Sequence, residues 1–430
     1  NDPALDAAVR AATGYSGPPT GDISAGDVAG ITSLDASHQG ITDLTGIENL
    51  TNLTVLDLAF NNITSVDPLE TMTGLTSLDL GFGYPGDADF NYMSNNANQL
   101  SDISPLDALV NLQYLNLGGN TGITDISVIS SMPALGALLL GYSPIADFSP
   151  LNDVDTQLRM FFALATGMSD TVVQNTVANM VNLRALGLSQ ISDISSLNGL
   201  TSLQSVLFGG CTFSDVSVMT NWPSLQQVAM LYCYSLTSLD SIASVNSIVF
   251  LNVSQSALSD ISAVSGLTNL STLILSNNQI TSLSDLLANA GLGDGDTVTI
   301  TGNPLTQEAI CVQLPQLETQ LQNGTLNATG YTCGSYALTM TVTGTGNVTP
   351  GAGVNYLPMD SDVALLASPV DGSGFAFDHW VIDGNDVSTN PYTITLTGDT
   401  AVEAVFTSAN VVTLTLAVNG PGSVGMDPGV

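Results

Sequence analysis

The sequence has almost no positive charge and little of the chemistry that enzymes use. It contains no lysine, three arginines and two histidines against 38 acidic residues, so the formal net charge of the 430 residues is −35. Nucleic acids and anionic membranes are bound by clustered cations, and we expect neither as a partner. Ser-His-Asp, Cys-His and phosphate-loop motifs are also absent from the sequence, which predicts a non-enzymatic protein without a cofactor.

Long apolar runs and closely spaced cysteines are lacking as well. The longest apolar stretches, such as residues 135–140, are much shorter than the roughly 20 residues of a membrane-spanning helix. Four cysteines are too few for a disulfide scaffold. The chain begins with Asn1 and shows no basic segment followed by an apolar one, which is typical of a mature secreted protein. Because 44% of the residues are apolar, the chain can still form two or three domains with hydrophobic cores.

A repeat of the form L-x-x-L-x-L-x-x-N-x-I organises residues 31–305. We number its positions from the first leucine, so that Leu53, Leu58 and Asn61 occupy positions 1, 6 and 9. The same frame begins at Ile31, Leu53, Leu75, Leu112, Leu135, Leu158, Leu183, Leu203, Leu225, Ile248 and Leu270, and a degenerate unit follows through Val298, Ile300 and Asn303. One unit cannot bury its own leucines. The repeat therefore predicts an α/β solenoid of about 12 coils, with a parallel sheet on the concave face.

Two segments are suited to cover the ends of this solenoid. Residues 3–13, within an N-terminal cap of residues 1–30, have the spacing of an amphipathic helix. Residues 307–322, within a C-terminal cap of residues 306–335, also have a helical pattern, and Cys311 and Cys333 flank it. A disulfide there would fasten the cap and would imply an oxidising compartment.

Two further cysteines, Cys211 and Cys233, occupy position 9 in adjacent coils. Their stacking is compatible with a disulfide or a metal site. We favour two buried free thiols, because a small thiol fits this inward position and is a weak donor.

After Cys333 the repeat stops and short runs of alternating apolar and polar residues follow between Gly, Pro and Asp turns. This pattern predicts a small all-β module at residues 336–408 with Phe377 and Trp380 in its core. The segment "TVTGTGNVTPGAGV" aligns with "LAVNGPGSVGMDPGV" at the end of the sequence, so residues 409–430 are expected to begin a second, truncated module.

The repeat units "LTNLTVLDLAFNNITSVDPL" and "LTNLSTLILSNNQITSLSDL" resemble those of bacterial internalin-type leucine-rich-repeat proteins. The segments "LTMTVTGTGNVTPGAG", "FAFDHWVIDG" and "AVEAVF" resemble internalin B-repeat modules. The resemblance implies a bacterial protein that is extracellular or displayed on the cell surface. Internalins continue from the repeats into an immunoglobulin-like domain, whereas this chain has a cysteine-bearing cap, so host-cell invasion is not carried over.

The concave positions of the repeat carry apolar residues that the core does not require. We call them the apolar strip: Phe60, Phe82, Tyr114, Leu139, Tyr142, Met160, Phe162, Leu207, Tyr232 and Phe250. Arg159 and Arg184 occupy position 2 of adjacent coils beside this strip. They are either neutralised by Asp153 and Asp155 or form the polar anchor of a binding site.

Acidic residues recur at two places in the repeat. Asp35, Asp57 and Asp79 occupy position 5 of successive coils, where they would form either a solvated row or a cation site. A second set precedes the convex segments and is expected to cap their turns: Asp43, Asp102, Asp125, Asp147, Asp193, Asp215 and Asp260.

An insertion at residues 81–97 begins like a calcium loop. Asp87, Asp89 and Asn91 have the D-x-D-x-N order that supplies oxygen ligands. The rest of the loop does not fit, because Tyr92 replaces the expected glycine and Asn98 replaces the closing glutamate. A contact loop is the alternative, with aromatic residues at Tyr84, Phe90 and Tyr92.

These features predict a secreted or cell-surface recognition and adhesion protein that binds a protein or glycan on its concave aromatic face. Two alternatives remain open. The chain could be a structural subunit that contacts copies of itself in an extracellular filament or surface array. It could also be the carbohydrate-binding accessory region of a larger secreted enzyme.

Overall fold

A computed structural model describes residues 2–13, 23–82 and 98–408 of the chain. The residues fall into two compact units. The first comprises the chain up to residue 305 together with residues 313–330, and the second comprises residues 306–312 together with the chain from residue 331 onward. In the described residues no helix has both the length and the apolar composition needed to cross a membrane.

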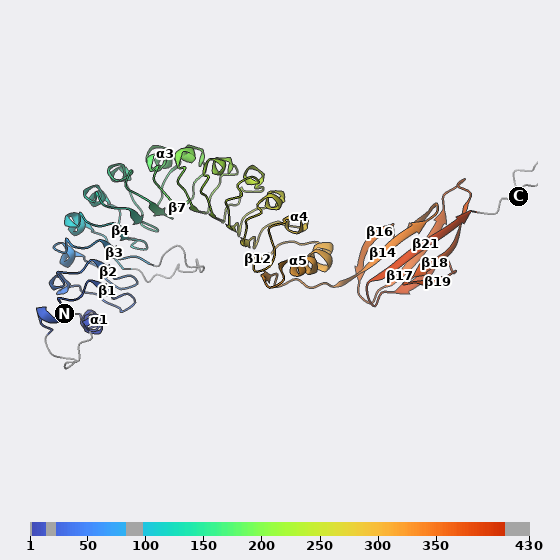
Figure 1. Cartoon of the computed structure of the whole chain (residues 1–430), viewed down its shortest axis with the longest axis horizontal. Helices are drawn as coiled ribbons and strands as arrows, with labels where there is room; N and C mark the ends of the chain where they lie inside the picture. Colours follow the sequence, from blue (N-terminus) through green and yellow to red (C-terminus); the bar gives the residue numbers. More distant parts are fainter. Residues whose placement is uncertain (1, 14–22, 83–97, 409–430) are drawn as a thin grey trace, which may run out of the picture. The chain divides into compact units, whose positions relative to one another are not determined.

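The first unit is the expected solenoid, a curved parallel sheet with its strands in sequence order (Figure 1). The strands are β1 (Ser33–Asp35), β2 (Val55–Asp57), β3 (Ser77–Asp79), β4 (Tyr114–Asn116), β5 (Ala137–Leu139), β6 (Met160–Ala163), β7 (Ala185–Ser189), β8 (Ser205–Gly209), β9 (Gln227–Leu231), β10 (Phe250–Asn252), β11 (Thr272–Ile274), β12 (Thr297–Thr299) and β13 (Thr325–Asn327). The sheet lines the concave side. Because side chains alternate along a strand, positions 4 and 6 enter the core while positions 3 and 5 face the concave surface.

Short helices line the convex side (Figure 1). They are η1 (Ile47–Asn49), η2 (Asp67–Leu69), η3 (Ser104–Ala108), η4 (Ser127–Ser131), η5 (Ser149–Asp153), α3 (Asp170–Asn175), η6 (Val177–Asn179), η7 (Ser195–Gly199), η8 (Ser217–Asn221), η9 (Asp240–Ile242), η10 (Ser262–Gly266) and α4 (Ser284–Ala288). The predicted aspartate caps are confirmed. Each of the seven accepts a hydrogen bond of 2.8–2.9 Å from the backbone N–H two residues later.

Asparagines at position 9 connect neighbouring coils. Asn61 accepts hydrogen bonds from the backbone N–H groups of Gln39 and Ile41 and donates to the carbonyls of Ala36 and Leu58. Asn120, Asn278 and Asn303 make equivalent bonds, as expected.

Asn98 belongs to the same row. It accepts from the N–H of Ile63 and donates to the carbonyls of Leu58 and Leu80. In the sequence we compared this residue with the closing ligand of a calcium loop; the structure gives it the role of a repeat asparagine, because the insertion lies between positions 8 and 9 of coil 3.

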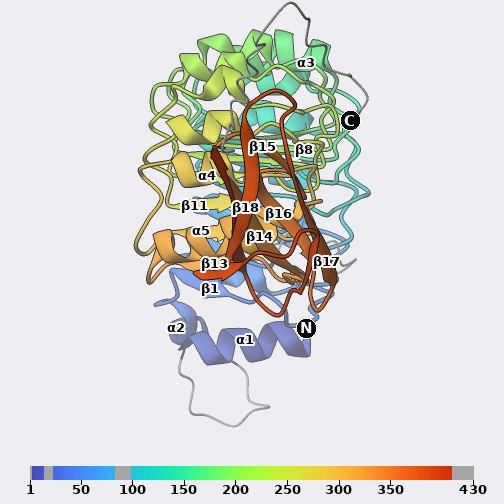
Figure 2. The same cartoon turned by 90° about the vertical axis from the view of Figure 1, so that its right-hand side faces the viewer.

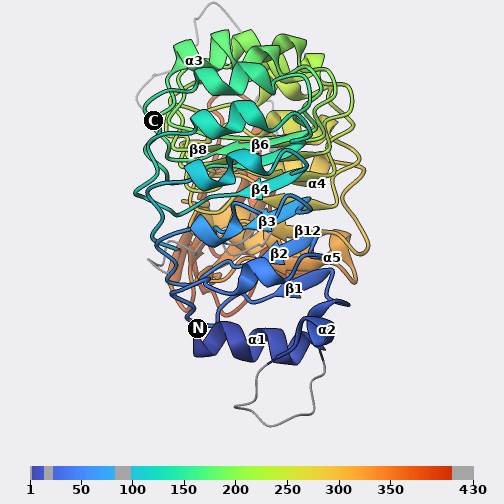
Figure 3. The ribbon, with the colours of Figure 1, turned by 90° about the vertical axis from the view of Figure 1, so that its left-hand side faces the viewer.

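The N-terminal cap contains α1 (Pro3–Thr13) and α2 (Ala25–Val28), which lie at the β1 end of the sheet (Figure 3). Asp2 joins α1 to coil 1. Its carboxylate accepts hydrogen bonds from the backbone N–H groups of Ala4 and Thr42. Burial raises the pKa of Asp2, but these hydrogen bonds lower it more, to about 2.

The C-terminal end differs from the prediction in one respect. The expected helix is present as a π-turn, η11 (Ala309–Gln313), followed by α5 (Leu314–Leu321), whose Leu317 and Leu321 are buried. The following segment then adds β13, which pairs in parallel with β12. The sheet therefore has 13 strands instead of the 12 that the repeat count implies. The predicted disulfide between Cys311 and Cys333 is confirmed, and Cys211 and Cys233 are buried free thiols.

The second unit has the expected β structure, and its strands face the viewer in Figure 2. One sheet has the order β16-β14-β21-β18-β19, and a smaller one has the order β15-β17-β20. The strands are β14 (Ser335–Thr343), β15 (Gly346–Thr349), β16 (Gly353–Pro358), β17 (Asp362–Pro369), β18 (Phe375–Ile382), β19 (Asn385–Val387), β20 (Tyr392–Thr395) and β21 (Thr400–Ser408). Trp380 is fully buried in the core, and Phe377 packs against it. The expected second module lies outside the described residues.

Candidate functional site

Part of the apolar strip forms a second hydrophobic cluster on the concave surface of the middle coils. Its buried members, which we call the concave cluster, are Leu139, Phe162, Leu207, Ala229 and Leu231. Tyr114, Met160, Leu164 and Ala185 pack around them and are partly exposed. The register Leu139–Phe162–Gly187–Leu207–Ala229 places most of the cluster at position 5 of consecutive strands. The cluster is therefore separate from the leucine core, which lies on the other face of the same sheet.

Gly187 makes room for the central ring of the concave cluster. A Cβ atom at this residue would lie 2.1 Å from Cδ1 of Phe162, so the aromatic ring occupies the space where a side chain would stand. Any larger residue at position 5 of coil 7 would push the ring away from the sheet. Gly187 thus allows Phe162 to cover coil 7 as well as its own coil.

Aromatic residues also occupy position 8 of several coils. Position 8 has a positive φ in many coils, including His38 (58°), Phe60 (56°), Tyr142 (63°) and Tyr232 (59°). Bulky side chains are disfavoured in this backbone region, where glycine or asparagine is usual. The Phe60 ring stacks on His38 at 4.2 Å between centroids, and Phe82 meets Tyr142 edge-on at 5.5 Å. Burial and the neighbouring Tyr232 raise the pKa of Tyr142.

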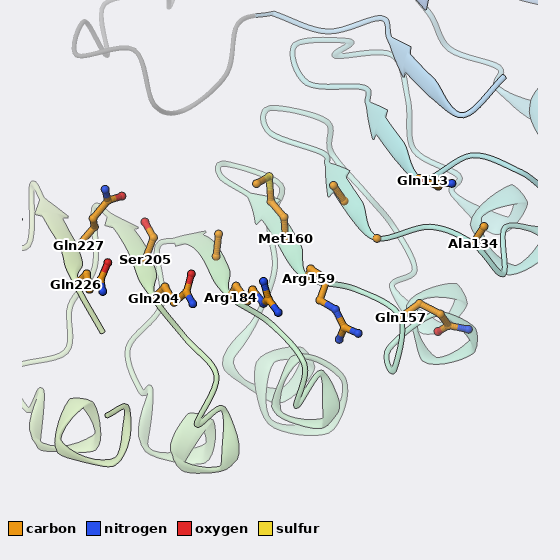
Figure 4. A pocket seen from close by; sticks show the side chains of 13 residues that line it. Gln113, Ala134, Gln157, Arg159, Met160, Arg184, Gln204, Ser205, Gln226 and Gln227 are labelled. Carbon is orange, nitrogen blue, oxygen red and sulfur yellow. The ribbon is translucent and has the colours of Figure 1, made fainter. Parts of the chain in front are cut away.

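A groove of about 730 Å³ runs along the strand starts of the middle coils. Position 2 supplies much of its lining: Gln113, Gly136, Arg159, Arg184, Gln204 and Gln226. Position 3 adds Ala137, Met160, Ala185, Ser205 and Gln227. In Figure 4 a row at the bases of successive strands is formed by Gln226, Gln204, Arg184 and Arg159, and Met160 rises from the sheet beside it. The groove thus combines polar side chains with a partly apolar floor.

Both arginines are exposed, and within the described residues neither side chain forms an ion pair or a hydrogen bond. Asp153 and Asp155, the neutralising partners considered from the sequence, do not pair with them. The two guanidinium groups start from adjacent coils, because the N–H of Arg184 donates to the carbonyl of Arg159 at 2.7 Å.

The structure therefore brings most of the predicted site residues into two adjoining areas. The concave cluster and its margin hold Tyr114, Leu139, Met160, Phe162 and Leu207, and the groove holds Arg159, Arg184 and Met160. Phe82 and Tyr142 form a pair, Tyr232 is 40% exposed and Phe250 is half-buried, while Phe60 pairs with His38 at the N-terminal end.

Sequence reasoning missed the glutamines. Their recurrence at position 2, in coils 4, 8 and 9, was the available signal.

The row of carboxylates at position 5 lies in the first three coils. Burial raises the pKa of Asp57 and of Asp79. Asp79 accepts hydrogen bonds from the N–H of Gly81, the hydroxyl of Tyr114 and the amide of Asn116. In the described part of the chain no three His, Cys, Asp or Glu side chains are arranged to hold a metal ion. The calcium-like residues Asp87, Asp89 and Asn91, and the contact loop around them, lie outside the described residues.

Comparisons with known proteins agree with this architecture. A model described as leucine-rich repeats (2 copies) matches residues 30–71, 51–91 and 92–131, and a model described as divergent InlB B-repeat domain matches residues 336–410. The predicted combination of internalin-type repeats with a following B-repeat module is thereby confirmed. No curated protein matched the chain.

Several solved structures are similar to this chain, and the first of them shares its fold. An internalin from Listeria monocytogenes is 24% identical; the match covers 76% of this chain and 94% of that one, with a TM-score of 0.56. Internalin C2 from the same species is 26% identical, with 59% and 93% covered and a TM-score of 0.41. A leucine-rich-repeat protein of Leptospira interrogans is 16% identical, with 70% and 97% covered and a TM-score of 0.39.

Proposed function

We propose that this chain is a bacterial extracellular recognition protein that binds a protein partner on the concave face of coils 4 to 9. Leucine-rich repeats combined with a B-repeat module support a role in protein interaction or adhesion at the bacterial surface. The disulfide between Cys311 and Cys333 supports an oxidising compartment. The B-repeat-like module then acts as a spacer between the solenoid and the point at which the protein is attached.

The observation that carries the proposal is the concave cluster with its partly exposed apolar margin. Leu139, Phe162 and Leu207 are nearly completely buried although they stand on the concave face of the sheet, opposite the leucine core. The partly exposed Tyr114, Met160 and Leu164 around them extend this apolar surface toward the solvent. Protein interfaces are commonly built in this way, with a packed apolar centre and aromatic residues that complete it in contact with the partner.

The aromatic residues at position 8 give independent support. Tyr142 and Tyr232 adopt a backbone conformation that costs free energy for a bulky side chain. The leucine core does not require a ring at these places, because Gln190, Gln255 and Asn277 have the same conformation in other coils. A role in binding would explain why tyrosine occupies a strained position at which the fold does not need a ring.

The test is to probe an array of purified extracellular proteins with the full chain and with a Tyr142→Ser, Tyr232→Ser double variant. We expect the wild-type chain to bind at least one protein and the double variant to bind it about tenfold or more weakly. Tyr234→Ser is the matched control, because Tyr234 is 67% exposed but lies outside position 8.

Three outcomes would contradict the proposal. Equal binding by all variants would place the site elsewhere. Binding only to a glycan array would favour the accessory-region alternative, and assembly of the purified chain in sedimentation experiments that Tyr142→Ser, Tyr232→Ser abolishes would favour the self-associating alternative.

A further inference from the structure

The groove beside the concave cluster carries guanidinium and amide groups, whereas the cluster itself is apolar. Arg159 and Arg184 are two of the three cations in a chain of net charge −35, and they stand in adjacent coils. Placing like charges side by side on neighbouring strands is unfavourable unless a counter-charge lies between them. The described residues supply no carboxylate to either guanidinium. Among the described residues the pair therefore has no protein counter-charge, and the solvent or a ligand can supply one.

The remaining groove residues define what kind of anion fits. A guanidinium group presents a planar fork of N–H donors that matches the two oxygens of a carboxylate. Gln113, Gln204 and Gln226 continue the row on either side of the arginines, and each amide can both donate and accept. Ala137, Met160 and Ala185 provide apolar contacts beside the row for methylene groups. The groove can thus hold carboxylates, peptide groups and short aliphatic stems along one line.

We propose that the Arg159–Arg184 groove binds the carboxylate side chains of an acidic segment in the protein partner, with the glutamines contacting its backbone. This inference rests on the proposed function, because the same partner would cover the concave cluster. A polyuronate glycan carries the same anionic group, but the groove residues in the described structure include no aromatic ring on which a sugar could stack. The observations therefore favour a polypeptide.

The net charge of the chain gives this site an unusual dependence on salt. An ordinary basic patch loses affinity for an acidic ligand as ionic strength rises. Here the 38 acidic residues repel an acidic peptide over long distances, whereas the two arginines attract it at contact. Salt near 0.1 M reduces interactions beyond about 10 Å more than the short contacts in the groove. Affinity is therefore expected to stay constant or to increase between low and physiological ionic strength.

The experiment measures binding of a fluorescently labelled hexaglutamate peptide to the full chain. We expect a Kd below about 1 mM at physiological ionic strength. We expect the Arg159→Gln, Arg184→Gln double variant to bind about tenfold or more weakly, and each single variant to be intermediate. Arg10→Gln is the matched control, since it removes one positive charge from α1, where Arg10 pairs with Asp6. Its affinity should remain within about twofold of the wild-type value.

The remaining outcomes overturn the inference. Absence of hexaglutamate binding excludes an acidic segment as the ligand. Equal losses in Arg10→Gln and in the arginine single variants would show a general charge effect, and binding of oligogalacturonate in place of hexaglutamate would identify a glycan.

The protein partner identified on the array distinguishes an error in the groove assignment from an error in the proposed function. If Tyr142→Ser, Tyr232→Ser loses the partner while the double arginine variant retains it, the concave face is the binding surface and the groove assignment is wrong.

Discussion

The end coils and the middle coils of the solenoid use the same repeat positions in opposite ways. At position 5 the first three coils carry Asp35, Asp57 and Asp79, whereas the middle coils carry Leu139, Phe162 and Leu207. These residues stand in register on one continuous sheet. Since the leucine core is equally buried beneath both sets, the fold does not determine position 5. The difference lies in the surface that each region presents, which is acidic in the first three coils and apolar in the middle coils.

Position 9 divides the solenoid in the same way. Coils 2 to 4 and 11 to 12 carry asparagine. The six coils between them carry Ser143, Thr166, Ile191, Cys211, Cys233 and Ser256. An asparagine side chain contacts up to five backbone groups, whereas the serine, threonine and cysteine side chains make one or two bonds. The end coils thus depend more on hydrogen bonds, and the middle coils depend more on apolar contacts across the concave face.

The largest effect should come from removing an end-coil asparagine. Asn61→Ala would leave the N–H groups of Gln39 and Ile41 and the carbonyls of Ala36 and Leu58 without this partner. We expect a loss of roughly 3–5 kcal/mol in the free energy of unfolding, measured by urea denaturation followed by circular dichroism. Ser143→Ala is the middle-coil counterpart and should cost about 1 kcal/mol, because Ser143 makes a single bond to the carbonyl of Asn120. Equal losses would remove the distinction between the two regions.

Removing the central ring of the concave cluster tests the middle coils. Phe162→Ala should lower the free energy of unfolding by about 2–3 kcal/mol, because the ring is 6% exposed and covers Gly187. Phe60→Ala is the control in an end coil, where the half-buried ring stacks on His38, and its effect should be well below that of Phe162→Ala. A larger effect at Phe60 would show that the concave cluster contributes no special stability.

The repeat made the solenoid predictable because position 1, 4 and 6 leucines recur at nearly constant spacing and have no stable place outside a stacked core. The same reasoning could not find β13, since the segment around Thr325 and Asn327 has no leucine frame and joins the sheet only because β12 offers an open edge. Asn98 was hidden by the insertion that separates it from its coil. The spacing of residues within one coil could not identify β13 or the role of Asn98, because in both cases the decisive contact is with a neighbouring coil.

The candidate site was only partly predictable for a related reason. Strand alternation correctly places Leu139 and Phe162 on the concave face, but it cannot show that they bury each other, which depends on sheet curvature and on the space above Gly187. Position 2 places Arg159 and Arg184 side by side. Whether Asp153 or Asp155 reaches them depends on loop and side-chain conformations that no sequence pattern encodes.

A smaller effect of opposite sign is expected at the carboxylates of the end coils. Burial, followed by repulsion from Asp35, raises the pKa of Asp57 above 3.8. The folded state therefore binds this proton more tightly than the unfolded chain, so the charged form destabilises the fold at neutral pH and the penalty declines as the pH falls through the raised pKa. Asp57→Asn keeps an acceptor for the N–H of Ala59 and should raise the free energy of unfolding by roughly 0.2–1 kcal/mol at pH 7.

Urea titrations at several pH values check this prediction. The difference between Asp57→Asn and the wild type should become smaller as the pH approaches 4. Asp43→Asn is the control with the opposite sign, because hydrogen bonds from Thr45 lower the pKa of Asp43 and its charged form stabilises the fold. A stabilisation at Asp57 that does not change with pH would show that charge is not its cause.

An effect of about the same small size should come from the thiols at position 9 of the middle coils. Cys233 is fully buried, and its sulfur lies 3.6 Å from the carbonyl oxygen of Leu231 and 4.0 Å from that of Phe208. These bonds are long, so the thiol contributes mainly by filling space.

We expect Cys233→Ala to cost about 1 kcal/mol and Cys233→Ser to cost less, since a serine hydroxyl can donate to Leu231 as Ser256 does to Ser254 in the next coil. The same urea denaturation measures both variants. If Cys233→Ser costs more than Cys233→Ala, position 9 of the middle coils is an apolar site that rejects a hydroxyl. The two regions would then differ in the chemistry of position 9, and not only in the number of hydrogen bonds that it makes.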